Sequence, residues 1–92
     1  MGRYFVDLTE PAKKDILQHK KAGNIAAIKK IEIILVELAE HPYTGTGKPE
    51  QLKYNLAGFW SRRINRTDRL IYSVSENTVT VEVVSAMGHY EE

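Results

Sequence analysis

The stretch from residue 25 to residue 40 constrains the fold more than any other part of the chain. Apolar side chains recur there with the i, i+3, i+7 spacing of an amphipathic helix, reinforced by Ile34: they are Ile28, Ile31, Leu35 and Leu38. Pro42 disfavours helical geometry at the residue before it, so the helix should end by His41. A helix with one apolar face needs a second layer to cover that face.

Alternating segments supply that second layer. The two-residue periodicity of β-strands is found at residues 4–8, 59–65, 69–75 and 78–84. A further helix is predicted from Thr9 to about Ala22, because the Thr9 hydroxyl can cap free amides and Pro11 is tolerated in the first turn. Gly23 can adopt the left-handed backbone conformation that ends the first helix, and Asn24 can cap the second helix.

The order strand, helix, helix and then three or more strands predicts an α+β fold. We expect an antiparallel β-sheet with two N-terminal helices packed on one face. Ninety-two residues suffice for one core and are too few for two, so residues 1–92 should form a single domain. The face of the sheet without helices would be left for a ligand.

The strands at 59–65 and 69–75 should form a hairpin, and its loop decides which side chains share a face. A three-residue loop at 66–68 keeps the apolar faces together, whereas a two-residue loop mixes them. The predicted pairs are then Asn65 with Arg69, Ile64 with Leu70, and Trp60 with Val74. This register places Arg62 on the core face with Trp60 and Ile64, and it places Arg63 and Arg69 together on the opposite face.

The middle of the chain is strongly basic. Residues 45–72 hold six of the thirteen basic residues and only two acids, Glu50 and Asp68, which gives a formal charge of +4 against +1 for the whole chain. Such a concentration is expected of a site that meets phosphates. The sequence has no cysteine for a disulfide or thiolate site, no signal-peptide pattern and no apolar run long enough to span a bilayer. We therefore expect a cytoplasmic protein without membrane contact.

The same stretch carries a family resemblance. The residues are Gly45-Thr-Gly-Lys-Pro-Glu-Gln-Leu-Lys53, Asn55-Leu-Ala-Gly-Phe-Trp-Ser-Arg-Arg-Ile64 and Asp68-Arg-Leu-Ile-Tyr72, with a His89-Tyr90 pair near the C-terminus. They closely resemble the YoeB (Txe) branch of the RelE-like bacterial toxins, while the N-terminal half matches only in pattern. The resemblance implies the RelE-like (microbial RNase-like) fold and an endoribonuclease that cuts mRNA in the A site of the 30S ribosomal subunit.

The resemblance also implies partners. These are mRNA, the ribosome and a cognate YefM-like antitoxin that neutralises the toxin, and a homodimer is compatible with it. It implies neither a cofactor nor a metal. The two other histidines, His19 and His41, have no partners at ligand spacing, so the residues also predict no metal site.

Metal-independent cleavage of RNA needs a base for the 2′-hydroxyl, cations for the phosphate and an acid for the 5′ leaving oxygen. Glu50 is the candidate base, because it is the only carboxylate in the basic run before Asp68. Arg63 and Arg69 carry forked donors that match phosphate oxygens, and His89 can transfer a proton near neutral pH.

The resemblance assigns cleavage to those same four residues. It gives Tyr90 a position that helps to bind or position mRNA, and we group Tyr90 with the catalytic residues. It implies that Lys48 and Lys53 bind or position mRNA, and we expect Arg62 and Arg66 of the same basic run to bind RNA with them.

Two other functions remain open from the residues alone. Taken singly, each candidate is most often a solvated surface charge, and only the joint match to a long motif favours catalysis. The chain could instead be a non-catalytic RNA-binding module or a ParE-like toxin that inhibits gyrase. Such a protein would need the arginines but neither Glu50 nor His89. The segment after Ala86 is expected to be mobile in the free protein, with Gly88 as a hinge.

Overall fold

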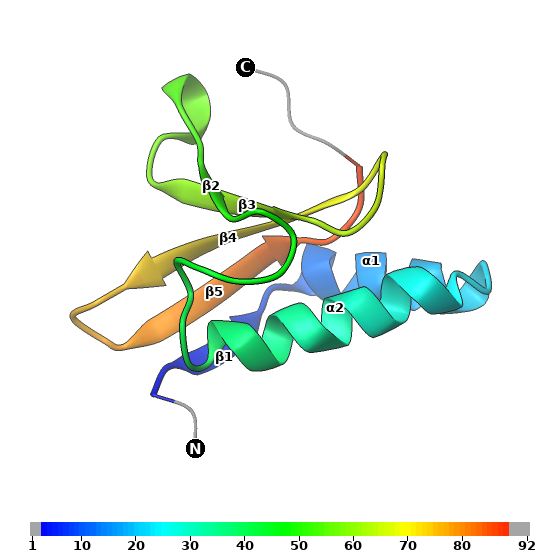
Figure 1. Cartoon of the computed structure of the whole chain (residues 1–92), viewed down its shortest axis with the longest axis horizontal. Coiled ribbons are helices and arrows are strands. Elements are labelled where there is room, and N and C mark those ends of the chain that lie inside the picture. The colour runs from blue at the N-terminus through cyan, green and yellow to red at the C-terminus, as the bar shows by residue number, and fades with distance from the viewer. Residues whose placement is uncertain (1–2, 89–92) are drawn as a thin grey trace.

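The computed structural model describes residues 3–88, in which two helices pack on one face of a five-stranded sheet (Figure 1). The elements are β1 (Phe5–Leu8), α1 (Glu10–Lys21), α2 (Ile25–Leu38), β2 (Glu50–Gln51), the 3-10 turn η1 (Tyr54–Leu56), β3 (Phe59–Arg63), β4 (Arg69–Ser75) and β5 (Thr80–Ser85). Neither helix in this part of the chain is both long and apolar enough to cross a membrane.

The sheet has the strand order β1-β5-β4-β3-β2. Strands β2 to β5 are antiparallel neighbours, whereas β1 pairs with β5 in parallel. The predicted α+β fold with both helices on one face is confirmed, but the sheet is mixed rather than wholly antiparallel. Parallel neighbours need a long connection between them, and here α1, α2 and three strands lie between β1 and β5.

Capping residues set the limits of α1 as predicted. The Thr9 hydroxyl accepts a hydrogen bond from the amide of Ala12 at 3.3 Å, and Pro11 lies in the first turn. Gly23 follows the helix with a φ of 73°, a conformation that favours glycine. Asn24 makes no side-chain cap for α2, because its amide group instead contacts His19 at 3.4 Å.

The core lies between the helices and the sheet. Side chains from the predicted apolar stripe of α2 pack there against inward side chains of β4 and β5. All are at most 1% exposed: Ile31, Ile34 and Leu38 from α2, and Leu70, Tyr72, Val81 and Val83 from the strands. Burial of an aliphatic side chain of this size contributes roughly 1.5–3 kcal/mol. The apolar periodicity of α2 therefore correctly identified the face that covers the sheet.

The β3–β4 hairpin differs from the predicted register by two residues. Arg63 pairs with Arg69 and Trp60 with Tyr72, so the loop covers residues 64–68. The Asn65 side chain accepts hydrogen bonds from the backbone amides of residues 67 and 68 at 2.9 and 2.8 Å, and this local turn replaces the predicted Asn65–Arg69 pair. A shift of two residues preserves parity, so Arg63 and Arg69 share a face as predicted.

Candidate active site

The face of the sheet that no helix covers, called the open face below, carries Glu50, Arg63 and Arg69. Glu50 of β2 is the register partner of Ser61, and Arg63 lies two residues further along β3, opposite Arg69 of β4. Register partners and alternate residues point to the same side of a sheet, so all four side chains project from this face. Glu50 and Arg63 are diagonal neighbours on adjacent strands, a spacing of about 7–8 Å, and Arg69 lies one strand further across the sheet, opposite Arg63.

A close contact holds the preceding loop against β3. The amide of Arg63 donates to the carbonyl of Gly47 at 2.7 Å. A Cβ atom at position 47 would lie 2.7 Å from the Arg63 carbonyl oxygen, and the backbone φ of Gly47 is 85°. Only glycine both lacks a Cβ atom and readily adopts this positive φ. The contact therefore fixes the chain just before the exposed Lys48 and Glu50.

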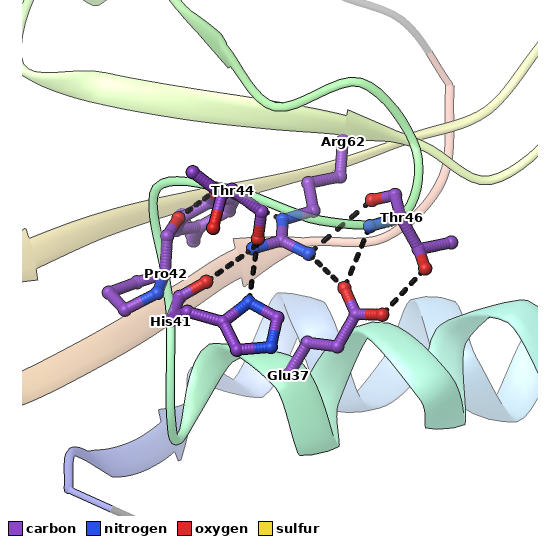
Figure 2. A network of polar contacts seen from close by, with 7 residues as sticks. Glu37, His41, Pro42, Thr44, Thr46 and Arg62 are labelled. Atoms are coloured by element: carbon purple, nitrogen blue, oxygen red, sulfur yellow. Dashed lines mark hydrogen bonds and ion pairs between the residues drawn. The ribbon is translucent and has the colours of Figure 1, made fainter.

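Arg62 has a different place from the one predicted. Its side chain is completely buried, and its guanidinium group donates to the Glu37 carboxylate at 2.6 Å and to the carbonyls of His41 and Thr44 at 2.9 and 2.8 Å (Figure 2). Its Nε atom donates to the Tyr72 hydroxyl at 3.2 Å. With its donors engaged in the interior, Arg62 is a structural residue, and the expected RNA contact by this residue is wrong.

Glu37 completes the network around Arg62. It accepts hydrogen bonds from the backbone amide of Thr46 at 2.8 Å and from the Thr46 hydroxyl at 2.6 Å. Burial acts to raise the pKa of Glu37, but the hydrogen bonds from Thr46 and Arg62 outweigh it and hold this pKa below its usual value. The network thus ties the loop that leads to Lys48 and Glu50 onto both α2 and β3 (Figure 2).

The role of Glu37 was missed from the sequence, although a signal was present. Parity placed Arg62 on the core face beside Trp60 and Ile64, and a charged side chain at a core position needs a buried partner of opposite charge. The carboxylate at position 37, on the second helix, supplies that partner.

Helix α1 holds the start of the C-terminal segment. The amide of Ala86 donates to the Asp15 carboxylate at 2.9 Å, and the Ala86 carbonyl lies 2.9 Å from Nε2 of His19. His19 is completely buried, and Asn24 contacts its Nδ1 atom. Because the carbonyl can only accept, Nε2 carries the proton in this arrangement. His19 is therefore a structural residue that binds the backbone.

The hairpin loop holds Gly88, two residues further along. The amide of Gly88 donates to the Asp68 carboxylate at 2.8 Å, and the amide of Arg69 donates to the Gly88 carbonyl at 2.7 Å. Burial acts to raise the pKa of Asp68, but the bond from Gly88 and those from the hairpin loop lower it overall. The expectation of a loose chain from residue 87 onward is therefore wrong as far as Gly88. His89 and Tyr90 lie outside the described residues.

Two other predicted residues lie outside the paired strands. Lys53 is exposed at the start of η1, and Arg66 is exposed in the hairpin loop. His41 contacts the Thr44 carbonyl through Nδ1 at 2.8 Å. Within residues 3–88, no three His, Cys, Asp or Glu side chains form a group that could hold a metal ion.

Two solved structures with this architecture are bacterial toxins. The YoeB/ParE toxin from Agrobacterium tumefaciens has a TM-score of 0.85 and 31% identity, with 94% of this chain and 99% of that chain covered. The YoeB toxin in a heterotetrameric YoeB–YefM toxin–antitoxin complex from Staphylococcus aureus has a TM-score of 0.78 and 34% identity, with 96% and 99% covered. The fold, with an acid and two arginines on its open face, is thus that of a RelE-like toxin.

The family is defined by the sequence comparisons. Residues 8–90 match the family model of the YoeB-like toxin of bacterial type II toxin–antitoxin systems. Toxin YoeB of Synechocystis sp. is 41% identical over 64 residues, which cover 70% of this chain and 72% of that protein. The chain belongs to the YoeB-like toxins of bacterial type II toxin–antitoxin systems. The resemblance stated from residues 45–72 is confirmed.

Proposed function

We propose that the chain is a ribosome-dependent endoribonuclease that cleaves mRNA in the ribosomal A site. One observation carries the proposal: a carboxylate and two arginines from three strands project from the same open face, namely Glu50, Arg63 and Arg69. Membership of a toxin family agrees with an activity that stops translation. The cytoplasm, where ribosomes translate, is the proposed site of action.

In the proposed reaction Glu50 accepts the proton of the 2′-hydroxyl. The 2′ oxygen then attacks the phosphorus, the bond to the 5′ oxygen breaks, and a 2′,3′-cyclic phosphate forms. Arg63 and Arg69 donate hydrogen bonds to the phosphate oxygens on which charge develops. Lys48 and Lys53, exposed on the same segment as Glu50, hold the RNA strand by charge.

His89 is the proposed acid that protonates the departing 5′ oxygen, with Tyr90 assisting in the cleavage. The anchoring of the preceding residue supports this role, because the Gly88 carbonyl accepts a hydrogen bond from the Arg69 amide at 2.7 Å. The chain therefore enters residue 89 from a fixed point beside a phosphate-binding arginine. An acid must reach hydrogen-bond distance of the leaving oxygen, and an anchored approach favours this.

A YefM-like antitoxin is the proposed inhibitor. A related toxin from Staphylococcus aureus forms a complex with YefM, and the open face of this chain exposes cations that an acidic or amphipathic segment would cover. Binding through those charges should weaken as salt is raised. A complex whose affinity is independent of salt, with Arg63 still accessible, would contradict this arrangement. The predicted homodimer stays a prediction.

The decisive experiment is to induce the chain in cells and to map mRNA 5′ ends by primer extension. The wild type should produce new ends within translated sequences, whereas Glu50→Gln should produce none. Glu32→Gln, an exposed glutamate on α2, is the matched control. If Glu50→Gln remained toxic and the wild type produced no new ends, the chain would be a binding module or a gyrase inhibitor.

Truncations test the proposed acid separately. Removal of residues 91–92 should preserve cleavage, and removal of residues 89–92 should abolish it. Full cleavage without His89 would mean that another group, in the toxin or in the ribosome, protonates the leaving oxygen.

A further inference from the structure

A basic groove lies beside the candidate active site, between α2 and the β3–β4 hairpin. Its volume is about 460 Å³, and it is lined by Lys30, Arg63, Ile64, Asn65, Arg66 and Arg69. Four of these six residues are cations, and none is an acid. Three of the cations come from the hairpin, whereas Lys30 reaches the groove from the second helix. No prediction from the sequence included Lys30.

The four cations of the groove have no carboxylate partners among the described residues. The ion pairs between residues 3 and 88 are Lys13 with Glu10 and Arg62 with Glu37, both outside the groove. Within residues 3–88, the guanidinium group of Arg69 donates only to two backbone carbonyls, those of Asn65 and Asp68, at 3.2 and 3.3 Å. Like charges around one groove repel each other, and an anion bound between them relieves this repulsion. The groove therefore favours a phosphate ligand.

A second hollow adjoins the groove at the start of α2. Both share Lys30, Ile64 and Asn65, and the second hollow, of about 610 Å³, is otherwise lined by residues 23–27. Its lining includes the apolar side chains of Ile25 and Ala27. A charged groove next to a hollow with apolar side chains suits a nucleotide, whose phosphate is charged and whose base has flat apolar faces.

We propose that this groove binds a second phosphate of the RNA strand, next to the scissile phosphate. Arg63 and Arg69 line the groove and also face Glu50, so a strand held by them at the scissile phosphate places its neighbouring phosphate within reach of Lys30 and Arg66. The inference rests on the proposed function, because its ligand is the strand that is cleaved. Lys30 is then an RNA-binding residue supplied by the helical layer.

The test measures binding of the purified toxin to a single-stranded oligoribonucleotide with a 2′-deoxy substitution at the cleavage site, by fluorescence anisotropy across a salt series. Lys30→Gln should weaken binding roughly 5-fold. It should also lower the slope of log K against log salt by about 0.7, the contribution of one phosphate contact on a single strand. Lys30→Arg should restore both values. Lys29→Gln, an exposed lysine on the same helix outside the groove, should change neither.

The outcomes separate this proposal from the proposed function. Equal binding by Lys30→Gln and Lys29→Gln, with both variants folded by circular dichroism, overturns the groove as an RNA site. Unchanged oligonucleotide binding with weaker binding to ribosomes that lack mRNA also overturns it, because the groove would then face ribosomal RNA. Weaker oligonucleotide binding by Lys30→Gln, together with no mRNA cleavage by the wild type on translating ribosomes, would support the groove as an RNA site. The same result would refute the proposed nuclease activity.

Discussion

Arg62 and Arg63 are adjacent in β3, yet the structure uses them in opposite ways. Arg62 points toward the helices, is completely buried, and donates to Glu37, to backbone carbonyls and to the Tyr72 hydroxyl. Arg63 points to the open face, is exposed, and has no carboxylate partner among the described residues. Strand parity alone separates them, since neighbouring residues of a strand face opposite sides.

The difference explains how one basic stretch can stabilise the fold on one side of the sheet and remain available, as proposed, for a ligand on the other. A buried charge is tolerated only when its hydrogen bonds are satisfied, so the Arg62 guanidinium is surrounded by acceptors from α2, the 41–46 loop and β4. An exposed arginine stays hydrated without such partners, and its donors remain available for phosphate. The buried network positions the loop, and in the proposed function Arg63 and Arg69, on the face without helices, bind the phosphate.

The largest effect should come from breaking the buried network. Arg62→Ala leaves Glu37 without its ion-pair partner and removes donors from the His41 and Thr44 carbonyls. Removal of one member of such a buried pair costs about 3–5 kcal/mol, which we expect as a loss in the free energy of unfolding measured by urea denaturation. Arg66→Ala in the exposed loop is the control and should change stability by less than about 0.5 kcal/mol. Equal stability of the two variants would refute the structural role of Arg62.

The two arginines on the face without helices should show the opposite behaviour. Arg63→Ala and Arg69→Ala should each reduce mRNA cleavage about 10²-fold or more, as expected when one donor to a developing charge is lost. Arg63→Ala should leave the free energy of unfolding nearly unchanged, because its side chain is exposed. Cleavage would be measured by primer extension on a reporter mRNA. Unchanged toxicity of Arg69→Ala would rule out its contact with the scissile phosphate.

Glycine substitutions test how tightly the loop is held against β3. Gly47→Ala places a Cβ atom 2.7 Å from the Arg63 carbonyl, whereas Gly23→Ala, at a similar positive φ, meets no atom within 4 Å. Both should lose about 1 kcal/mol to backbone strain, and Gly47→Ala should lose more. Only Gly47→Ala should also reduce cleavage, because the loop carries Lys48 and Glu50. Thermal unfolding and primer extension would measure the two effects.

Local periodicity predicted the helices and most strands because it depends on residues close in sequence. The stripe of α2, the Thr9 cap and the shared face of Arg63 and Arg69 all follow from spacing and are found in the structure. The hairpin register was wrong because the Asn65 side chain binds the backbone amides of residues 67 and 68, and the resulting turn replaces the predicted pairing of Asn65 with Arg69. The shift of two residues left each side chain on its predicted face of the sheet. The candidate site depends only on which side chains share a face.

Contacts between distant segments could not be predicted from spacing. Glu37 meets Arg62 across 25 positions of sequence, and His19 meets the Ala86 carbonyl across 67. The parallel pairing of β1 with β5 is of the same kind. Each depends on how the layers pack, and a single sequence carries only indirect signs of this, such as a charged residue at a core position.

The smallest predicted effect concerns the pH dependence of the buried network. Hydrogen bonds from Thr46 and Arg62 hold the folded-state pKa of Glu37 below its usual value, so in acid the unfolded chain binds a proton before the folded chain does. Stability from this group is therefore complete above the ordinary carboxyl pKa and is lost as the pH falls through the folded-state value. Glu37→Gln should flatten the acid decline in the free energy of unfolding, measured by urea denaturation at a series of pH values. Glu32→Gln, exposed on the same helix, should leave the decline unchanged. Identical pH profiles for the wild type and Glu37→Gln would mean that Arg62 is held by the backbone carbonyls of the loop rather than by its ion pair.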